Sequence, residues 1–400
     1  MAGCATEHFK KSRSATPCRV TSFDTYPRTS LPVIEYSNRS SIELIIGYER
    51  FIGTIEAAEV PTLVRDLHED QCRMIAAKAS PVARQLESHG RWLQRMNRTS
   101  PSIIRGVFLQ AQHERLVHVA NSHEAYLSLL EVYLQRSVVD QMRSVLVESE
   151  EAIESFRNAG IEIPGDPTEV QRRKMDVEQQ SSDLRMNQNK LNRGIESLLE
   201  LIPQTDLPIW TSFNVSTRSP VPTEAFATNT ALSSRKDLQA LETIERGSHC
   251  LTSEEMKGLS SGNPFLGSSI SIPGTTKCFQ ISLKKKIAEL KRSENIEYQR
   301  QLHDSVVILQ NKIQLEVMEA LQNISNHLDR LRVTKNKLTN FQNSLDAETK
   351  AKDQRPVDPA VRTAKEIEAL KAVSEMIHES IAVEIAYVQL ERAMGSPLAE

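Results

Sequence analysis

The chain has 400 residues, a formal net charge of −3 and few glycine or aromatic residues, with 14 glycines and 5% Phe, Trp and Tyr. This composition favours a helix-rich protein whose apolar residues form narrow seams rather than one thick core. Acidic and basic residues alternate without a large basic block, which argues against electrostatic capture of DNA or RNA. No apolar run approaches the ~18 to 20 residues of a membrane-spanning helix.

Residues 1–56 are predicted to form an N-terminal tether with a lipidation site. Residues 5–40 are rich in Ser, Thr, Arg and Pro and show no sustained period. Just before them, Ala-Gly-Cys resembles the end of a bacterial lipoprotein cleavage box and predicts that Cys4 is acylated. An apolar signal region normally precedes such a box, so we expect the true start to lie upstream of Met1.

Two helical regions follow the tether. The first is predicted over residues 57–95, and a break at 97–101 separates it from a long helix over residues 107–156. The long helix would have ~50 residues and a length of roughly 75 Å.

A turn and a return helix come next. The turn is predicted at residues 160–167, where Asp166 can cap free amides and Pro167 suits the first turn of a helix. The return helix is predicted to end at Pro203, and the four prolines of residues 203–232 predict a loop-rich stretch.

The second half of the chain predicts the same sequence of elements. A helix starts within residues 234–242, which match residues 80–87. A Gly/Ser/Thr-rich stretch at 247–283 contains an alternating segment and predicts one or two short strands within 265–283. A second long helix, predicted over 283–349, would have ~65 residues and span roughly 100 Å.

The two halves form a tandem repeat. A shift of 192 positions places Asp166-Pro167 on Asp358-Pro359 and aligns the return helices without a gap. Apolar residues then pair at intervals of nine, seven and seven, the spacing of a seam along one helix face. We therefore predict a first repeat at 57–203, a linker at 204–232 and a second repeat at 233–396, each repeat being a long antiparallel helical hairpin. The pairs are Met175 with Ile367, Leu184 with Met376, Leu191 with Val383, and Leu198 with Leu390.

Three segments carry a resemblance to a known family, the TolC-like outer-membrane efflux proteins. Residues 234–238, Ser-Arg-Lys-Asp-Leu, resemble the family's Arg/Asn-Pro-Asp-Leu helix start. Residues 156–161 together with 168–170 are similar to its first hairpin tip, and residues 386–395 to its C-terminal signature. The resemblance extends over residues 60–396.

The resemblance implies a mainly α fold, in which tandem-duplicated long antiparallel hairpins from three chains close into an α-barrel. It also implies a small shared outer-membrane β-barrel, whose strands need ~9 to 11 alternating residues each. The first repeat leaves room for strands only within residues 102–109, and Pro273 and Gly274 interrupt the second. We therefore expect a reduced β-barrel portion, with acylated Cys4 as the main membrane attachment.

The implied function is that of an outer-membrane channel in an efflux or secretion system, a passive periplasmic conduit for small molecules or export substrates. Its implied partners are two further copies, a periplasmic adaptor and an inner-membrane transporter, and its implied location is the outer membrane, facing the periplasm. The two hairpin tips, 159–168 and 350–359, would contact the adaptor and form the gate. The candidate tip residues are Ala159, Gly160, Ile161, Asp166, Thr168, Asp353 and Asp358.

No enzymatic, cofactor or metal motif accompanies this pattern. Phosphate-binding, dinucleotide-binding, zinc-protease and hydrolase-elbow motifs do not occur, and Ser233 to Lys236 has a Ser-x-x-Lys spacing without companion motifs. The other four cysteines have no metal or disulfide spacing. His113, His118 and His123 are five residues apart, which turns them around a helix. We expect no catalytic, cofactor-binding or metal-binding residues.

Two other classes of protein share parts of the pattern. A coiled-coil scaffold without transport activity, inside the cell or in the periplasm, would have the same heptads and mixed charges. A periplasmic adaptor would have a long hairpin, but only one, flanked by strand-rich halves. For a helical tunnel, the polar residues opposite the apolar seams should face water; examples are Glu148, Glu151, Lys337 and Asn340.

Overall fold

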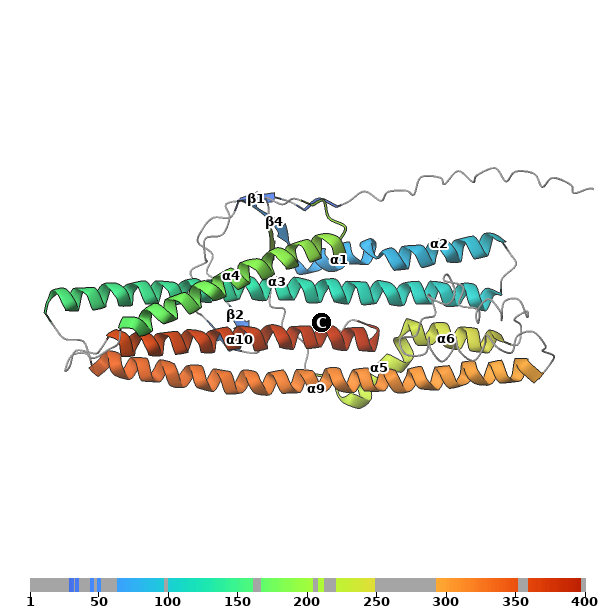
Figure 1. Cartoon of the computed structure of the whole chain (residues 1–400). Coiled ribbons are helices and arrows are strands. Elements are labelled where there is room, and N and C mark those ends of the chain that lie inside the picture. Colours follow the sequence, from blue (N-terminus) through green and yellow to red (C-terminus); the bar gives the residue numbers. More distant parts are fainter. Residues whose placement is uncertain are drawn as a thin grey trace, which may run out of the picture.

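Four long helices dominate the computed structural model (Figure 1). They run lengthwise and form two antiparallel hairpins, α3 with α4 and α9 with α10. The long helices are α3 (Pro101–Asn158), α4 (Pro167–Leu198), α9 (Ser293–Ala351) and α10 (Pro359–Met394). The structure describes residues 29–31, 33–35, 44–46, 49–51, 63–96, 100–160, 167–203, 208–211, 221–248, 293–351 and 359–396.

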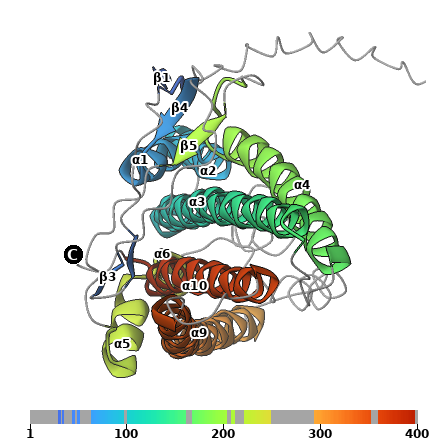
Figure 2. The same ribbon diagram turned by 90° about the vertical axis from the view of Figure 1, so that its left-hand side faces the viewer.

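The four long helices lie side by side in one layer (Figure 2). Helix α4 packs on α3, α3 on α10, and α10 on α9. The second hairpin therefore joins the first through α10 and α3, while α4 and α9 form the two edges of the layer. With 58 residues, α3 is ~87 Å long at 1.5 Å per residue.

Four shorter helices cover the part of the layer away from the hairpin tips. Helices α1 and α2 pack on α3, and α5 and α6 pack on the second hairpin, with α6 also against α3. One residue, Ser80 or Arg235, separates the members of each pair, so both halves have the same helix order. The short helices are α1 (Glu69–Ala79), α2 (Pro81–Met96), α5 (Glu224–Ser234) and α6 (Lys236–Gly247).

Two small sheets accompany the helices in the part of the chain that the structure describes. In the larger one, β4 pairs with β1 in antiparallel and with β5 in parallel orientation, and β2 and β3 form a separate antiparallel pair. The strands are β1 (Val33–Glu35), β2 (Leu44–Ile46), β3 (Glu49–Phe51), β4 (Leu63–Leu67) and β5 (Ile209–Thr211).

Buried Arg65 fixes the larger sheet to the first hairpin. Its guanidinium lies 2.6 Å from Glu196 on α4 and donates to the Ile202 carbonyl at 3.2 Å. A buried arginine needs such partners because an unpaired charge in the interior is costly. The sheet is therefore anchored where α4 ends.

The core consists of seams between helices rather than one thick interior. One cluster joins α1, α3, α4 and α10, and includes Leu127, Leu130, Leu134 and Val138. These residues recur every three or four positions along α3, which places them on one face of the helix. A second cluster joins α2, α3, α5, α6, α9 and α10. The narrow seams agree with the low aromatic content of the chain.

The long helices and their return helices are confirmed, with both return helices starting at the predicted prolines, Pro167 and Pro359. The four polar residues expected to face water, Glu148, Glu151, Lys337 and Asn340, are all exposed. The strands predicted within 265–283 lie outside the described residues. Whether the repeat boundaries are those given above stays a prediction.

Three local predictions were wrong. Residues 63–67, expected to be helical, form β4, and the expected loop-rich stretch 203–232 contains β5 and the start of α5. Residues 102–109, the space left for strands in the first repeat, are the first turns of α3. Pro101 at the first helical position explains this start, because its fixed φ suits a helix and its missing N–H has no partner to lose there.

The end of α10 depends on a glycine. Gly395 has φ +69°, and a Cβ there would lie 2.9 Å from the Cα of Arg235. Gly160, at the end of α3, has φ +73° with no described atom within 4 Å of its Cβ position. The two glycines share a left-handed backbone and differ in packing.

We expect Gly395→Ala to lower the free energy of unfolding by about 3 kcal/mol, because it adds a backbone clash to left-handed strain. Gly160→Ala carries only the strain and should cost about 1 kcal/mol. Urea unfolding followed by circular dichroism measures both. Equal losses would show that the Gly395 contact contributes nothing.

Candidate functional site

The break between α5 and α6 carries a cluster of buried polar contacts. Arg235 stands between the two helices with an extended backbone, and its N–H donates to the Ala231 carbonyl at 3.1 Å. The Ser234 hydroxyl lies within hydrogen-bonding distance of the Met394 carbonyl, at the end of α10. The break thus receives the end of α10, with Gly395 packed on Arg235.

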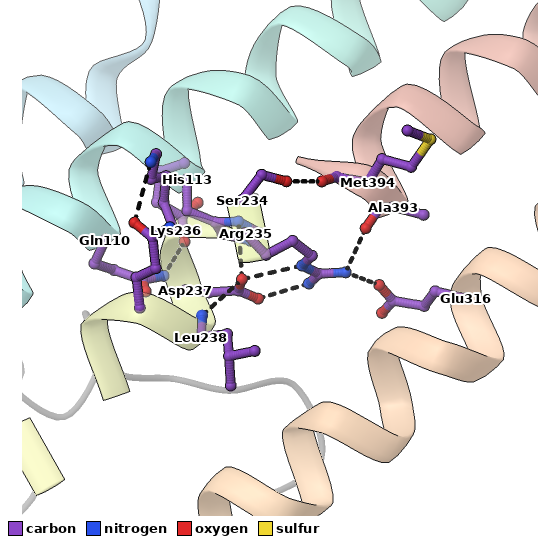
Figure 3. A network of polar contacts seen from close by, with 12 residues as sticks. Gln110, His113, Ser234, Arg235, Lys236, Asp237, Leu238, Glu316, Ala393 and Met394 are labelled. Carbon is purple, nitrogen blue, oxygen red and sulfur yellow. Dashed lines mark hydrogen bonds and ion pairs between the residues drawn. The ribbon is translucent and has the colours of Figure 1, made fainter. Parts of the chain in front are cut away.

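A buried ion network surrounds this break (Figure 3). The Arg235 guanidinium, with a side chain only 6% exposed, donates to both carboxylate oxygens of Asp237, Nε to Oδ1 at 3.0 Å and Nη2 to Oδ2 at 2.6 Å. Its Nη1 pairs with Glu316 on α9 and lies 3.5 Å from the Ala393 carbonyl on α10. The guanidinium of Arg235 therefore joins α6, α9 and α10 through its hydrogen bonds.

The network keeps its charges despite burial. Burial alone would raise the pKa of Asp237, but Arg235, His113 and the Leu238 N–H, which donates at 2.9 Å, outweigh it and lower that pKa. Burial likewise opposes the charge of Arg235, and Asp237 and Glu316 outweigh it, so the pKa of Arg235 is raised. Both groups are ionised at neutral pH.

His113 links the network to α3. Its Nδ1 lies 3.6 Å from Asp237 Oδ1. Burial lowers the pKa of His113, and the nearby Asp237 offsets this only in part, so the imidazole is neutral at neutral pH. Four helices, α3, α6, α9 and α10, therefore meet in one polar cluster.

A cavity of about 470 Å³ lies next to the cluster. Charges of both signs line it, and they pair within the protein, as Lys312 does with Glu316 at 3.5 Å. Paired charges of this kind hold neighbouring helices together. The lining includes His113, Arg235, Asp237, Lys312, Glu316 and Arg392.

The structure places three of the predicted tip residues at one end of the molecule. Ala159 follows α3 with helical dihedral angles, and Gly160 turns the chain with positive φ. Thr168 is the second residue of α4, and all three are exposed. Their role as adaptor contact or gate stays a prediction. The other candidate residues, Cys4, Ile161, Asp166, Asp353 and Asp358, lie outside the described residues.

Ion pairs connect neighbouring long helices between the hairpin tips and the Arg235 cluster. Glu150 on α3 accepts from Lys174 of α4 at 2.9 Å, and Lys337 of α9 pairs with Glu375 of α10 at 3.1 Å. His378 of α10 pairs with Glu131 of α3 at 2.7 Å, across the two repeats.

The sequence pattern identified Arg235 and Asp237 only as a helix start. Their partner Glu316 lies 81 residues from Arg235, on another helix, and shows no local signal. The repeat alignment offers no clue either, because Ser80 occupies the position of Arg235 in the first repeat. The missing information is the packing of α9 against α6.

Solved structures of outer-membrane channels resemble the chain along most of its length. CusC, described as forming a transmembrane channel, matches with a TM-score of 0.59 and 11% identity over 92% of this chain and 99% of its own. A membrane protein from Pseudomonas aeruginosa matches with 0.59 and 14% identity over 93% and 97%. The open MtrE outer-membrane channel of Neisseria gonorrhoeae matches with 0.53 and 13% identity over 93% and 97%.

No protein-family description and no curated protein matches the sequence. At 11–14% identity, the structural likeness concerns the fold. The chain has the fold of the TolC-like outer-membrane channels, as the sequence resemblance predicted. Within the residues that the structure describes, no helix has an apolar stretch long enough to cross a membrane.

Asp237→Asn should lower the free energy of unfolding by about 3 kcal/mol, because it removes the main partner of a buried arginine. The matched control is Glu242→Gln, which breaks an i,i+4 pair with Arg246, whose side chain is 78% exposed. That control should change stability by less than ~0.5 kcal/mol. Urea unfolding at neutral pH gives both values, and similar losses would contradict the buried network.

His113 should make stability depend on pH. Its folded pKa lies below its ordinary value of 6.5, so as pH falls below 6.5 the unfolded chain takes up a proton that the folded chain does not, and stability falls. Asp237 affects stability at lower pH. Its folded pKa lies below the ordinary value of 3.8, so the stability that it contributes is lost only as the pH falls below 3.8.

His113→Gln should therefore lose less stability than the original protein between neutral pH and pH values above the Asp237 window. Urea unfolding at a series of pH values measures the difference. His378→Gln, at a half-exposed imidazole, is the control, and an unchanged pH dependence in His113→Gln would reject the interpretation.

Proposed function

We propose that this chain is the outer-membrane channel component of an efflux or secretion system. It would act as a passive conduit for small molecules or export substrates. One observation carries the proposal: the fold matches channel structures over 97–99% of their length and 92–93% of this chain. A shared part such as one hairpin would not match at this extent.

The two edges of the helical layer support assembly with further copies. Apolar side chains are exposed along α4 and α9, among them Val307 and Met318 of α9 at 41% and 47%. The five most exposed have exposed fractions from 52% to 63%. On α4 they are eleven residues apart, and on α9 they are seven and eighteen apart, so each set lies on one face of its helix. The residues are Met175 and Met186 on α4, and Ile308, Leu315 and Val333 on α9.

Exposed apolar side chains that recur along one face of an edge helix favour an interaction surface there. The α4 edge of one copy pairs with the α9 edge of the next in a head-to-tail contact, and such contacts form a ring when the rotation closes. We propose closure after three copies, as in the trimer that the family resemblance implies. The six hairpins would then enclose a helical tunnel.

The remaining assignments follow from this assembly. The tips at 159–168 and 350–359 would contact a periplasmic adaptor and form the gate, and an inner-membrane transporter would supply energy. The opposite end would face the outer membrane, with acylated Cys4 as a tether. The repeats at 57–203 and 233–396 would each contribute one hairpin per copy.

Engineered cysteines at Met186 and Val333 test the ring. Met186 lies 19 residues from the start of α4 and Val333 lies 18 residues from the end of α9, so they stand at similar distances from the tips. In a chain otherwise free of cysteine, mild oxidation of Met186→Cys with Val333→Cys should yield crosslinked dimers and trimers and nothing larger. The matched control pairs Val333→Cys with Val82→Cys, which is exposed on α2, away from both edges, and should stay uncrosslinked.

Conduction is tested in the original chain, which keeps Cys4. Reconstituted into lipid vesicles, its trimer fraction should release an entrapped small dye, whereas its monomer fraction should not. A dimer limit, or crosslinked species beyond three copies, would contradict the ring. A trimer that releases no dye would favour the coiled-coil scaffold without transport activity.

A further inference from the structure

An exposed patch at the end of α2 differs from the edges described above. It consists of Arg91, Trp92, Arg95 and Met96, and is called the α2 end patch. Trp92 is 52% and Met96 46% exposed, and both arginines are exposed. Trp92 and Met96 are four residues apart, as are Arg91 and Arg95, so the four side chains share one side of the helix.

The patch faces away from the protein. The opposite side of α2 buries Ala83, Leu86, Gly90 and Leu93, and a Cβ at Gly90 would lie 3.0 Å from the Phe108 ring on α3. Helix α2 lies on neither edge of the four-helix layer, so the ring contact between α4 and α9 does not cover it.

The charge of the patch is positive. Glu87 is the one acidic residue of α2, and it pairs with Arg115 of α3 as well as with Arg91, at 3.6 Å. Arg91 therefore shares its partner with Arg115, and Arg95 lies one turn beyond Arg91 and two turns from Glu87. Aromatic and cationic side chains side by side suit the boundary between lipid headgroups and acyl chains.

The position of the patch agrees with this chemistry. Helix α2 ends four residues before α3 begins, at the end of α3 opposite the hairpin tips (Figure 1). The end of α6 lies there too, since a Cβ at Gly247 would come within 2.1 Å of the Ser102 hydroxyl on α3. Under the proposed function, this is the end that faces the outer membrane.

We propose that the α2 end patch rests on the surface of an anionic lipid bilayer, with Trp92 and Met96 inserted among the headgroups and the two arginines on lipid phosphates. The proposal rests on the proposed outer-membrane role. A ring of three copies would present three such patches on one side. Binding through three patches at once is stronger than binding through one, although each patch makes the same contacts.

Trp92 can report its own surroundings, because the chain has two tryptophans. In full-length Trp210→Phe protein, Trp92 is the one remaining indole. Vesicles of phosphatidylethanolamine and phosphatidylglycerol should shift its emission to shorter wavelength, and lipids brominated on the acyl chain should quench it. Phosphatidylcholine vesicles should have a weaker effect.

Charge variants separate this patch from general attraction to lipid. Arg91→Gln with Arg95→Gln should weaken binding to the anionic vesicles roughly tenfold or more in a sedimentation assay. The matched control, Arg157→Gln with Arg172→Gln, removes two exposed arginines near the hairpin tip and should leave binding unchanged. Circular dichroism verifies that both variants fold.

Three outcomes would overturn the proposal. The protein could sediment with vesicles while Trp92 stays unquenched, it could fail to bind, or the Trp92 emission could shift with protein concentration alone, which would assign the patch to a second copy. The crosslink between α4 and α9 needs no lipid. A trimer with unquenched Trp92 therefore rejects this inference and leaves the proposed channel intact.

Discussion

The structure depends on one constraint: a helix of 58 residues can bury only a narrow stripe of its surface, so it needs neighbours along its whole length. The repeat meets this need by placing two helices of 58 and 59 residues and two shorter return helices in a row, where α3 and α10 each have a neighbour on both sides. A row has two ends, and α4 and α9 keep exposed apolar side chains there. In the proposed ring, α4 of one copy would cover α9 of the next, so neither edge of the row would stay exposed.

The two repeats solve the same local problem differently. Each has a single-residue break between its short helices, and a break leaves backbone amides without helical partners. In the first repeat the Ser80 hydroxyl accepts the Ala83 N–H at 3.4 Å. In the second, Arg235 fills the break and its charge requires Asp237 and Glu316. That requirement ties α6 to α9, so the second repeat has a buried polar anchor at this position.

The sequence predicted the parts of the fold that repeat over many turns. A seam repeated over fifty residues outweighs local exceptions, and the prolines at the first positions of α4 and α10 indicated where the return helices start. Strand β4 could not be found this way, because five residues carry little period and its partner Ile209 lies far along the chain from Arg65. Glu316 could not be predicted as a partner of Arg235 for the same reason, because the two residues are 81 positions apart in the sequence. Ala159, Gly160 and Thr168 lie at the end of the first hairpin because they adjoin the ends of α3 and α4, and their role there stays a prediction.

The distribution of polar contacts suggests where a channel of this kind would move. The ion pairs near the tips, such as Lys174 with Glu150 and Lys337 with Glu375, are at least partly exposed to water. Exposed pairs of this type contribute little to stability. The Arg235 cluster is buried, and separating its members would leave a charge unpaired in the interior. Helices that are joined by weak ion pairs near the tips and by a buried ion network near the middle can change their angle at the tips. The apolar contacts between them elsewhere would be kept. The proposed gate at the tips therefore lies beside the more exposed of these ion pairs.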